Sequence, residues 1–303
     1  MIAMKIEKPK SIKMELNENR IFSLLADRIY KNELALLREL IQNSIDAGTN
    51  KVNINYRRLA NGLWLLEIED FGKSMSYEFL ENDFKKVGQQ FKSGNNTIGV
   101  YGIGRLSIWK LKNKLKHVFL IATTDRETTI LTWISPREYQ LIKTPKKIGH
   151  RGVIYRLILK GDINIHEIEK YLIKQFLLTD TPIYLNGELI SSKKELVYED
   201  TNIKIYNYET FWVKVYCKNL FVDWISIHLP LAIDFKYDIT TLSRDSIRVP
   251  RDFIEEKILN ALPQLLTRNR EYWLMHLSKL VDFLYDKEKL EEFVNFIPVR
   301  VGN

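Results

Sequence analysis

The sequence predicts an α+β protein whose first part carries a largely antiparallel, hairpin-rich sheet. Two segments with alternating apolar residues, 51–58 and 63–70, flank an Asn61-Gly62 turn signal, a pattern typical of a β-hairpin. Residues 34–47 instead repeat leucine and isoleucine every three or four positions, as an amphipathic helix does. The chain has 303 residues, of which 45% are hydrophobic, and this is enough for a packed core and about two domains.

The remaining elements follow from the same two periodicities and from the turn residues between them. Helices are predicted at 20–48 with a stop at Gly48, and at 76–90, 105–115, 166–178, 252–268 and 271–293. Strands are predicted at 117–125, 127–135, 152–160, 203–208, 211–217 and 222–229, with a hairpin at 183–190 around Asn186-Gly187. We expect two domains, 1–195 and 196–303, with the boundary in the polar segment 190–196 and a smaller α+β unit after it.

Net charge and cysteine content limit the classes of function. The formal net charge is +8, and residues 101–150 hold ten basic against three acidic side chains. Such a basic half fits an anionic ligand, a nucleotide or a nucleic acid, but also a solvated lysine-rich surface. The single cysteine, Cys217, excludes an intrachain disulfide and a zinc site built on several thiolates. The N-terminus has no apolar signal segment, and no stretch is apolar for long enough to span a bilayer, so we expect a cytoplasmic protein with no membrane partner.

A first candidate motif is RELIQNSIDAG at residues 38–48. On a helix Glu39, Asn43 and Asp46 share one face, opposite a stripe of leucine and isoleucine. A glutamate can take the proton of an attacking water, and an asparagine oxygen one turn away can bind magnesium, which prefers oxygen ligands. The alternative is a polar helix face that binds nothing, as on most surface helices.

A second motif, IEDFGKSM at residues 68–75, leaves a strand through a tight turn. Asp70 at the strand end can accept a hydrogen bond from an exocyclic amine. Gly72 allows close approach of the backbone to a ligand, and Met75 offers a flexible apolar surface to a ring. The alternative is an ordinary exit from a strand.

The third motif is GVYGIGR at residues 99–105, which opens a predicted helix. Its glycines, Gly99, Gly102 and Gly104, let backbone N–H groups converge on an anion at a helix N-terminus. The spacing GxxGxG differs from the dinucleotide-binding GxGxxG, and no P-loop lysine follows. A glycine cluster alone is weak support for a phosphate site.

In this order and within about seventy residues, the three motifs resemble the nucleotide-binding boxes of the GHKL ATPase superfamily, which holds gyrase, the 90-kDa heat-shock chaperone, histidine kinases and MutL. The resemblance is closest to the heat-shock chaperone. Residues 28–48 resemble its first helix pair, FKSG at 91–94 resembles the entry to its ATP lid, and 151–162 followed by TPIYL resemble the end of its nucleotide domain. The resemblance implies a Bergerat-type two-layer α/β sandwich. The segments WVKVYCKNLFV and LSRDSIR resemble the family's middle domain.

This resemblance implies a magnesium-dependent ATPase with a chaperone-like, conformational use of ATP. Glu39 would be the general base, and Asn43 would hold magnesium. Asp70 would bind the adenine amine, with Gly72 near the ring and Met75 packed on it. The other residues that the resemblance assigns to the nucleotide are Asp46, Lys92, Gly99, Gly102, Gly104 and Arg105.

Arg244, in LSRDSIR, would reach the γ-phosphate from the second domain. The sequence also departs from the family pattern. Ser74 replaces the second glycine of DxGxG, where a required positive φ would be strained, and Val153 replaces a threonine hydroxyl whose hydrogen bond is worth about 0.5–1.5 kcal/mol. The lid before GVYGIG is short, and we expect no counterpart of the chaperone's C-terminal dimerisation domain. We therefore expect a monomer without nucleotide, with an ATP-dependent homodimer through the N-terminal arm 1–20 as the alternative for the bound form.

Three alternative functions remain. A histidine kinase is disfavoured, because kinases of this superfamily normally lack a carboxylate at the position of Glu39 and the first histidine here is His117. A nucleic-acid-associated ATPase like MutL, the microrchidia ATPases or a topoisomerase B subunit fits the basic segment 101–150. A non-hydrolysing nucleotide scaffold is disfavoured by Glu39. A client protein and DNA therefore both stay open as partners beside ATP and ADP.

Overall fold

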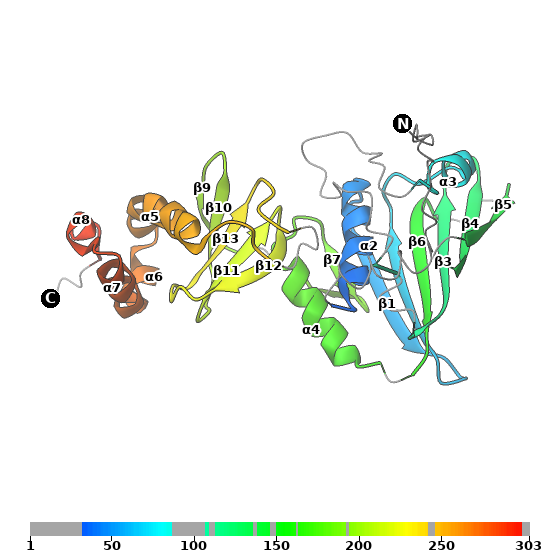
Figure 1. Ribbon diagram of the computed structural model, residues 1–303, viewed down its shortest axis with the longest axis horizontal. Coiled ribbons are helices and arrows are strands. Elements are labelled where there is room, and N and C mark those ends of the chain that lie inside the picture. The colour runs from blue at the N-terminus through cyan, green and yellow to red at the C-terminus, as the bar shows by residue number, and fades with distance from the viewer. Residues whose placement is uncertain are drawn as a thin grey trace, which may run out of the picture.

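The computed structural model describes residues 32–86, 107–108, 113–135, 138–145, 150–161, 163–191, 194–241 and 246–298. Its elements form two lobes that lie end to end along the longest axis, each built from one sheet and the helices packed on it (Figure 1). This arrangement confirms the predicted α+β class. Within the described residues, no helix is both long and apolar enough to cross a membrane.

An eight-stranded sheet forms the first lobe, with the strand order β5-β4-β3-β6-β2-β1-β7-β8. Its strands are β1 (Val52–Arg58), β2 (Trp64–Asp70), β3 (Leu115–Thr123), β4 (Thr128–Ser135), β5 (Glu138–Thr144), β6 (Gly152–Leu159), β7 (Ile183–Leu185) and β8 (Glu188–Leu189). Neighbouring strands are antiparallel except for β1 and β7, which are parallel. The sheet is therefore hairpin-rich, as the alternation of apolar residues predicts.

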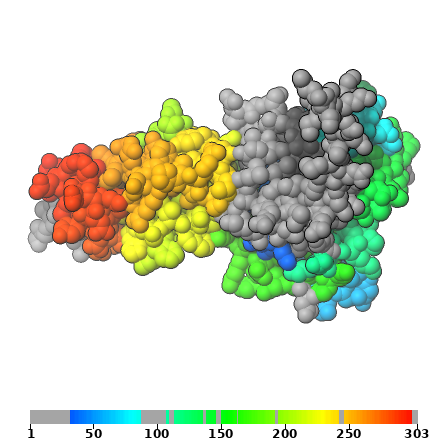
Figure 2. Space-filling model, in the orientation of Figure 1, coloured from blue at the N-terminus to red at the C-terminus, as the bar shows by residue number. Residues whose placement is uncertain are grey.

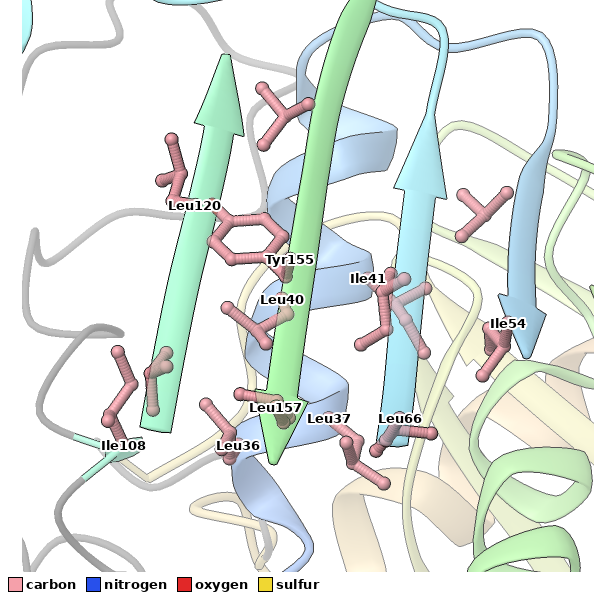
Figure 3. Packing of buried hydrophobic residues seen from close by; sticks show 14 of the residues in the cluster. Leu36, Leu37, Leu40, Ile41, Ile54, Leu66, Ile108, Leu120, Tyr155 and Leu157 are labelled. Carbon is pink, nitrogen blue, oxygen red and sulfur yellow. The ribbon is translucent and has the colours of Figure 1, made fainter. Parts of the chain in front are cut away.

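Helices cover one face of this sheet: α2 (Ala35–Asp46), α3 (Tyr77–Asn82) and α4 (Ile165–Phe176). Figure 3 shows the buried stripe of α2, including Leu37 and Ile41, lying against side chains of the central strands such as Leu66 and Leu157. Each fully buried leucine or isoleucine of this layer contributes about 1.5–3 kcal/mol relative to an exposed one. The result is a two-layer sandwich of helices on a sheet. The polar residues near the end of α2 lie outside its apolar core.

Turn residues set the limits of several elements in the first lobe. Gly48, at φ 74°, follows the end of α2, as predicted. Asn186 and Gly187, at φ 48° and 88°, form the hairpin turn between β7 and β8, as predicted. The turn between β1 and β2 is longer than the Asn61-Gly62 pair alone, because residues 59–63 form it.

Three local predictions in the first lobe need correction. Leu115, which we expected at the end of a helix, begins β3. The helix expected over 76–90 is described only as α3, with Ser76 accepting a hydrogen bond from Phe79 N as its cap. Strand β5 was missed, although Tyr139 and Leu141 alternate with exposed neighbours along this edge strand.

The second lobe holds a five-stranded sheet in the order β12-β11-β13-β10-β9, in which β11 and β13 are parallel. Its strands are β9 (Leu196–Glu199), β10 (Ile203–Asn207), β11 (Val213–Cys217), β12 (Leu220–Ile225) and β13 (Leu231–Phe235). Helix α5 (Arg251–Arg268) packs on one face through residues such as Ile258 and Leu262, both fully buried.

The single helix predicted over 271–293 is wrong. The chain forms α6 (Arg270–Met275), α7 (Leu277–Asp286) and α8 (Leu290–Phe293) instead. His276 leaves helical geometry at φ −113° and ψ 21°, and Glu288 lies in the left-handed region at φ 55°. These breaks let Trp273, Leu280 and Phe293 all reach one core, which a straight helix could not do.

The two lobes meet where α4 contacts β12, seen at the junction in Figures 1 and 2. Leu178, just after α4, joins a small buried cluster with Tyr216 and Phe221 of the second sheet. Asn219 Nδ2 donates to Asp180 Oδ2 across the same junction at 3.3 Å. The junction therefore combines apolar packing with a polar contact at its exposed edge.

Candidate functional site

Helix α2 carries the first group of predicted site residues. Glu39 is 8% exposed, and Asn43 and Asp46 are partly exposed. The guanidinium of Arg38, itself buried, contacts Glu39, with Nη2 3.2 Å from Oε1. The leucine stripe of α2 faces the sheet, so these polar residues lie on the other side of the helix, as their spacing predicts. The Arg38 contact orients the Glu39 carboxylate.

Asp70 ends β2 and is 1% exposed. Its Oδ1 accepts hydrogen bonds from the backbone N–H groups of Gly72, at 3.0 Å, and Val153, at 3.3 Å. The hydroxyl of Ser44, on α2, donates to Leu40 O at 3.2 Å and also lies beside this carboxyl group. Burial raises the pKa of Asp70 above its usual value, while Gly72, Ser44 and Val153 act in the opposite direction. Asp70 is thus a buried hydrogen-bond acceptor at the sheet end, with one of its oxygens held by two backbone donors.

The backbone after Asp70 packs directly on the end of α2. Lys73 N donates to Ala47 O at 2.8 Å, and a Cβ at Gly72 would lie 2.7 Å from the same oxygen. Glycine is therefore required at position 72 by the contact with α2. This contact brings Asp70 to the same end of the sandwich as Asn43 and Asp46.

Gly152 is a site residue that the sequence reasoning did not single out. It opens β6 at φ 129°, and a Cβ there would lie 2.1 Å from Asp70 O. Ser74, which stands in a glycine position of the family pattern, donates its hydroxyl to Gly152 O at 2.9 Å. Ser74 is not among the described non-glycine residues with positive φ, so the expected strain is absent there. The available signal was a glycine at the first position of the predicted strand 152–160.

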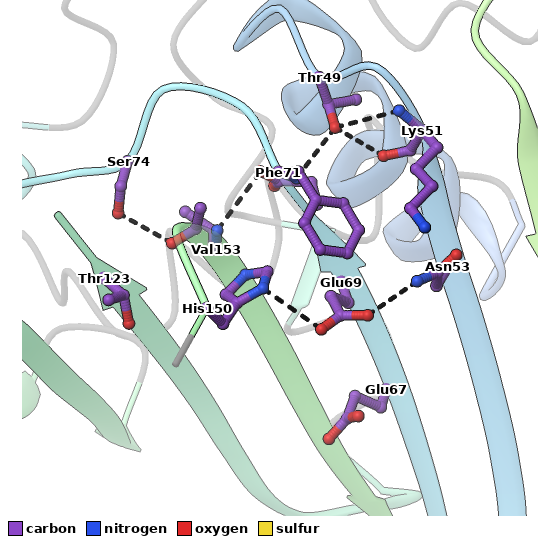
Figure 4. A network of polar contacts seen from close by, with 12 residues as sticks. Thr49, Lys51, Asn53, Glu67, Glu69, Phe71, Ser74, Thr123, His150 and Val153 are labelled. Carbon is purple, nitrogen blue, oxygen red and sulfur yellow. Dashed lines mark hydrogen bonds and ion pairs between the residues drawn. The ribbon is translucent and has the colours of Figure 1, made fainter. Parts of the chain in front are cut away.

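A polar network supports this strand end from the opposite face of the sheet, as Figure 4 shows. Glu69 Oε1 lies 3.3 Å from His150 Nδ1, and Glu69 Oε2 accepts from Asn53 Nδ2 at 2.8 Å. The His150 ring meets Phe71 edge-on at 4.9 Å, and Thr49 Oγ1 accepts from Phe71 N at 2.9 Å. No motif pointed to this network, because its members come from separate strands and loops.

Several predicted site residues cannot be placed. Lys92, Gly99, Gly102, Gly104, Arg105 and Arg244 lie outside the described residues. Met75 is described and partly exposed, and it packs against the core of the first lobe. In the basic segment, Lys114 forms an exposed ion pair with Glu33 at 2.5 Å, so this lysine belongs to a solvated surface. Among the described residues, no three histidine, cysteine or carboxylate side chains gather as they would around a metal.

Two comparisons bear on this arrangement. Residues 30–148 match the family described as histidine kinase-, DNA gyrase B- and HSP90-like ATPases. The chain is also 26% identical over 298 residues to chaperone protein HtpG of Fusobacterium nucleatum subsp. nucleatum. That match covers 86% of this chain and 47% of HtpG, so the chain spans about half the length of the curated relative. The resemblance predicted from the motif order is confirmed by both matches.

Proposed function

We propose that the first lobe, which matches the GHKL-type ATPases over residues 30–148 and resembles the 90-kDa heat-shock chaperones, binds ATP and hydrolyses it with magnesium. In this proposal the chain divides into an ATP-binding part, 1–195, and a second part, 196–303. Among the described residues no strand is shared between the two sheets, which supports this division.

The hydrogen bonding of Asp70 carries the proposal. An ionised carboxylate offers about four lone-pair positions, and the backbone N–H groups of Gly72 and Val153 both donate to the same oxygen of Asp70, Oδ1. The other oxygen, Oδ2, can then accept a hydrogen bond from a donor on a ligand. The exocyclic amine of adenine is such a donor, and the half-buried Met75, five residues after Asp70 in the chain, would pack on the adenine ring.

The polar face of α2 supplies the groups for the phosphates. Asn43 would hold magnesium through its side-chain oxygen, which fits a hard cation that takes few protein ligands and completes its shell with phosphate oxygens and water. When bound, the ion neutralises phosphate charge. Glu39, oriented by Arg38 one residue before it, would accept the proton of the attacking water.

The second lobe would use the ATP cycle for conformational work. In this proposal Arg244 stabilises charge on the γ-phosphate, and Gly99, Gly102 and Gly104 cradle the phosphates. We infer a chaperone-like role with a client protein as partner, a monomer without nucleotide, and an ATP-dependent homodimer as the state to look for. A nucleic-acid-associated ATPase is the second candidate, because the lobe junction carries the lysine-rich surface described below.

The test is ATP turnover by the full chain, alone, with DNA and with an unfolded protein. Glu39→Ala should bind ATP but lose about 10²–10⁴-fold in turnover, since a general base contributes that much. Stimulation by unfolded protein supports the chaperone-like role, whereas stimulation by DNA supports the second candidate. Near-normal turnover by Glu39→Ala, with magnesium present, overturns the assignment of the base.

A further inference from the structure

The second sheet has one face that its helices leave uncovered. Val215 points into the core with α5, whereas its neighbour Lys214 lies on the opposite face. On that face the pairing of the strands aligns Tyr206, Ala232, Lys214 and Trp224 in one row across β10, β13, β11 and β12. Residues directly opposite in such rows have Cβ atoms about 4.5–5.5 Å apart. Tyr206 and Ala232 are buried in the cluster at the junction with the first lobe, so the open part of the row is Lys214 and Trp224, beside α4.

Lysine ammonium groups lie on aromatic rings along this row. Lys214 Nζ is 4.1 Å from the centre of the Tyr208 ring and 2.7 Å from its hydroxyl. Lys194 approaches the same ring at 5.2 Å. At the other end Lys174, from α4, lies 3.8 Å above the ring of Trp224. We call these five residues the lysine–aromatic strip.

The lysines of the strip lack the neutralising partners found elsewhere in the lobe. Among the described carboxylates, none lies within 4.0 Å of a strip lysine, whereas Lys236 pairs with Glu199 at 2.8 Å. Burial lowers the pKa of Lys174, and the charge of Lys214 lowers it further, while Asp223 opposes both effects. Three lysines are thus gathered at this junction, and Asp223 acts on one of them, Lys174, from beyond ion-pair distance; the excess of positive charge favours an anionic ligand.

Exposed ring surface accompanies these charges. Trp224 is 44% exposed, and Tyr208 and Lys214 are partly exposed. A surface that alternates positive charge and open aromatic faces has the two features by which single-stranded nucleic acids are held, phosphate neutralisation and base stacking. An acidic protein segment would satisfy the lysines but would leave the ring faces unused.

We propose that the lysine–aromatic strip binds single-stranded nucleic acid at the junction of the two lobes. The lysine ammonium groups turn toward phosphates, and bases stack on the ring faces that these ammonium groups contact in the free protein. The strip lies apart from the Asp70 site, so this proposal does not depend on ATP binding.

The experiment measures the fluorescence anisotropy of a labelled oligothymidine titrated with the full chain, without nucleotide, between about 50 and 200 mM salt. Three neutralised phosphates predict a slope of log affinity against log salt of about −2, because each contributes about −0.7 on single strands. Lys214→Gln should weaken binding and reduce the slope by about 0.7, and Lys214→Arg should restore both. Trp224→Ala should weaken binding about tenfold, and Trp224→Phe should retain most of the affinity.

Lys257→Gln is the matched control. Its ammonium also lies over a ring, that of Phe253 at 5.2 Å, but on α5 at the other face of the sheet. It should leave the affinity unchanged. The proposal is overturned if Lys257→Gln and Lys214→Gln lose the same affinity for the oligothymidine. It is also overturned if the native chain does not bind the oligothymidine at the lowest salt concentration. An oligoglutamate peptide that binds as tightly and is insensitive to Trp224→Ala overturns it too, because this result would identify an acidic protein as the ligand. Thermal unfolding followed by circular dichroism confirms that each variant is folded.

Discussion

Replacing Asp70 with asparagine should separate nucleotide binding from folding stability. Asparagine keeps one side-chain oxygen, which can still accept from the N–H groups of Gly72 and Val153 at the present 3.0 and 3.3 Å. Its amide nitrogen replaces the second oxygen, so a donor faces the adenine amine where an acceptor is needed. A hydrogen bond to a charged group is worth about 1.5–3 kcal/mol, so ATP affinity should fall roughly ten- to a hundredfold.

The folding stability of Asp70→Asn at neutral pH should not fall with its ATP affinity. Burial raises the pKa of Asp70 above 3.8, so the folded state binds more protons than the unfolded state between the two pKa values. The contribution of Asp70 to stability is therefore fully present below its unfolded pKa and is lost as the pH rises through its folded pKa. The neutral amide of Asp70→Asn removes this contribution to the pH dependence, and the melting temperature at neutral pH should stay equal or rise.

Calorimetric titration with ATP and ADP, together with thermal unfolding, measures both effects. Glu69→Gln is the matched control, since Glu69 precedes Asp70 on the same strand but faces the network with His150 and Asn53. It should leave nucleotide affinity unchanged. ATP affinity of Asp70→Asn within twofold of the native protein would refute the adenine assignment. A parallel loss of affinity and melting temperature would show that Asp70 serves folding instead.

Three further variants test the site and the junction. Arg244→Ala should lower ATP turnover strongly and leave ADP affinity unchanged in calorimetry, because ADP lacks the γ-phosphate; an equal loss of ATP turnover and ADP affinity would rule out the proposed action of Arg244 on the γ-phosphate. Gly152→Ala should destabilise the fold by at least about 1–3 kcal/mol in urea unfolding, because φ is 129° and the new Cβ would lie 2.1 Å from Asp70 O; an unchanged midpoint contradicts this. Asp234→Asn should flatten the pH dependence of stability between about pH 4 and 7, because burial raises the pKa of Asp234 from 3.8 to about 7 and native stability is lost as the pH rises through that range. Melting curves at pH 5 and 8 measure this, and an unchanged pH dependence in the variant excludes Asp234 as its source.

Chain periodicity was sufficient to predict most of the first lobe. The spacing of leucine and isoleucine predicted α2 and hence the shared side of Glu39, Asn43 and Asp46, because these are properties of a single helix. Alternation and turn residues predicted the hairpins, since their pairing is local in sequence. The position of Asp70 at a strand end followed in the same way.

Contacts between segments far apart in the chain were not predictable from those patterns. The breaks at His276 and Glu288 depend on which side chains reach the second core, not on propensity along one helix.

The sequence by itself determined the α+β class, the order of the motifs and the residue types at the candidate site. Only the tertiary structure decided that Asp70 is buried, that Gly152 must lack a side chain beside it, and that lysines from two lobes meet on one aromatic surface. The physical reason is that helical and strand periodicity act over a few residues, whereas burial, close backbone approach and clustering of charge depend on how separate elements pack.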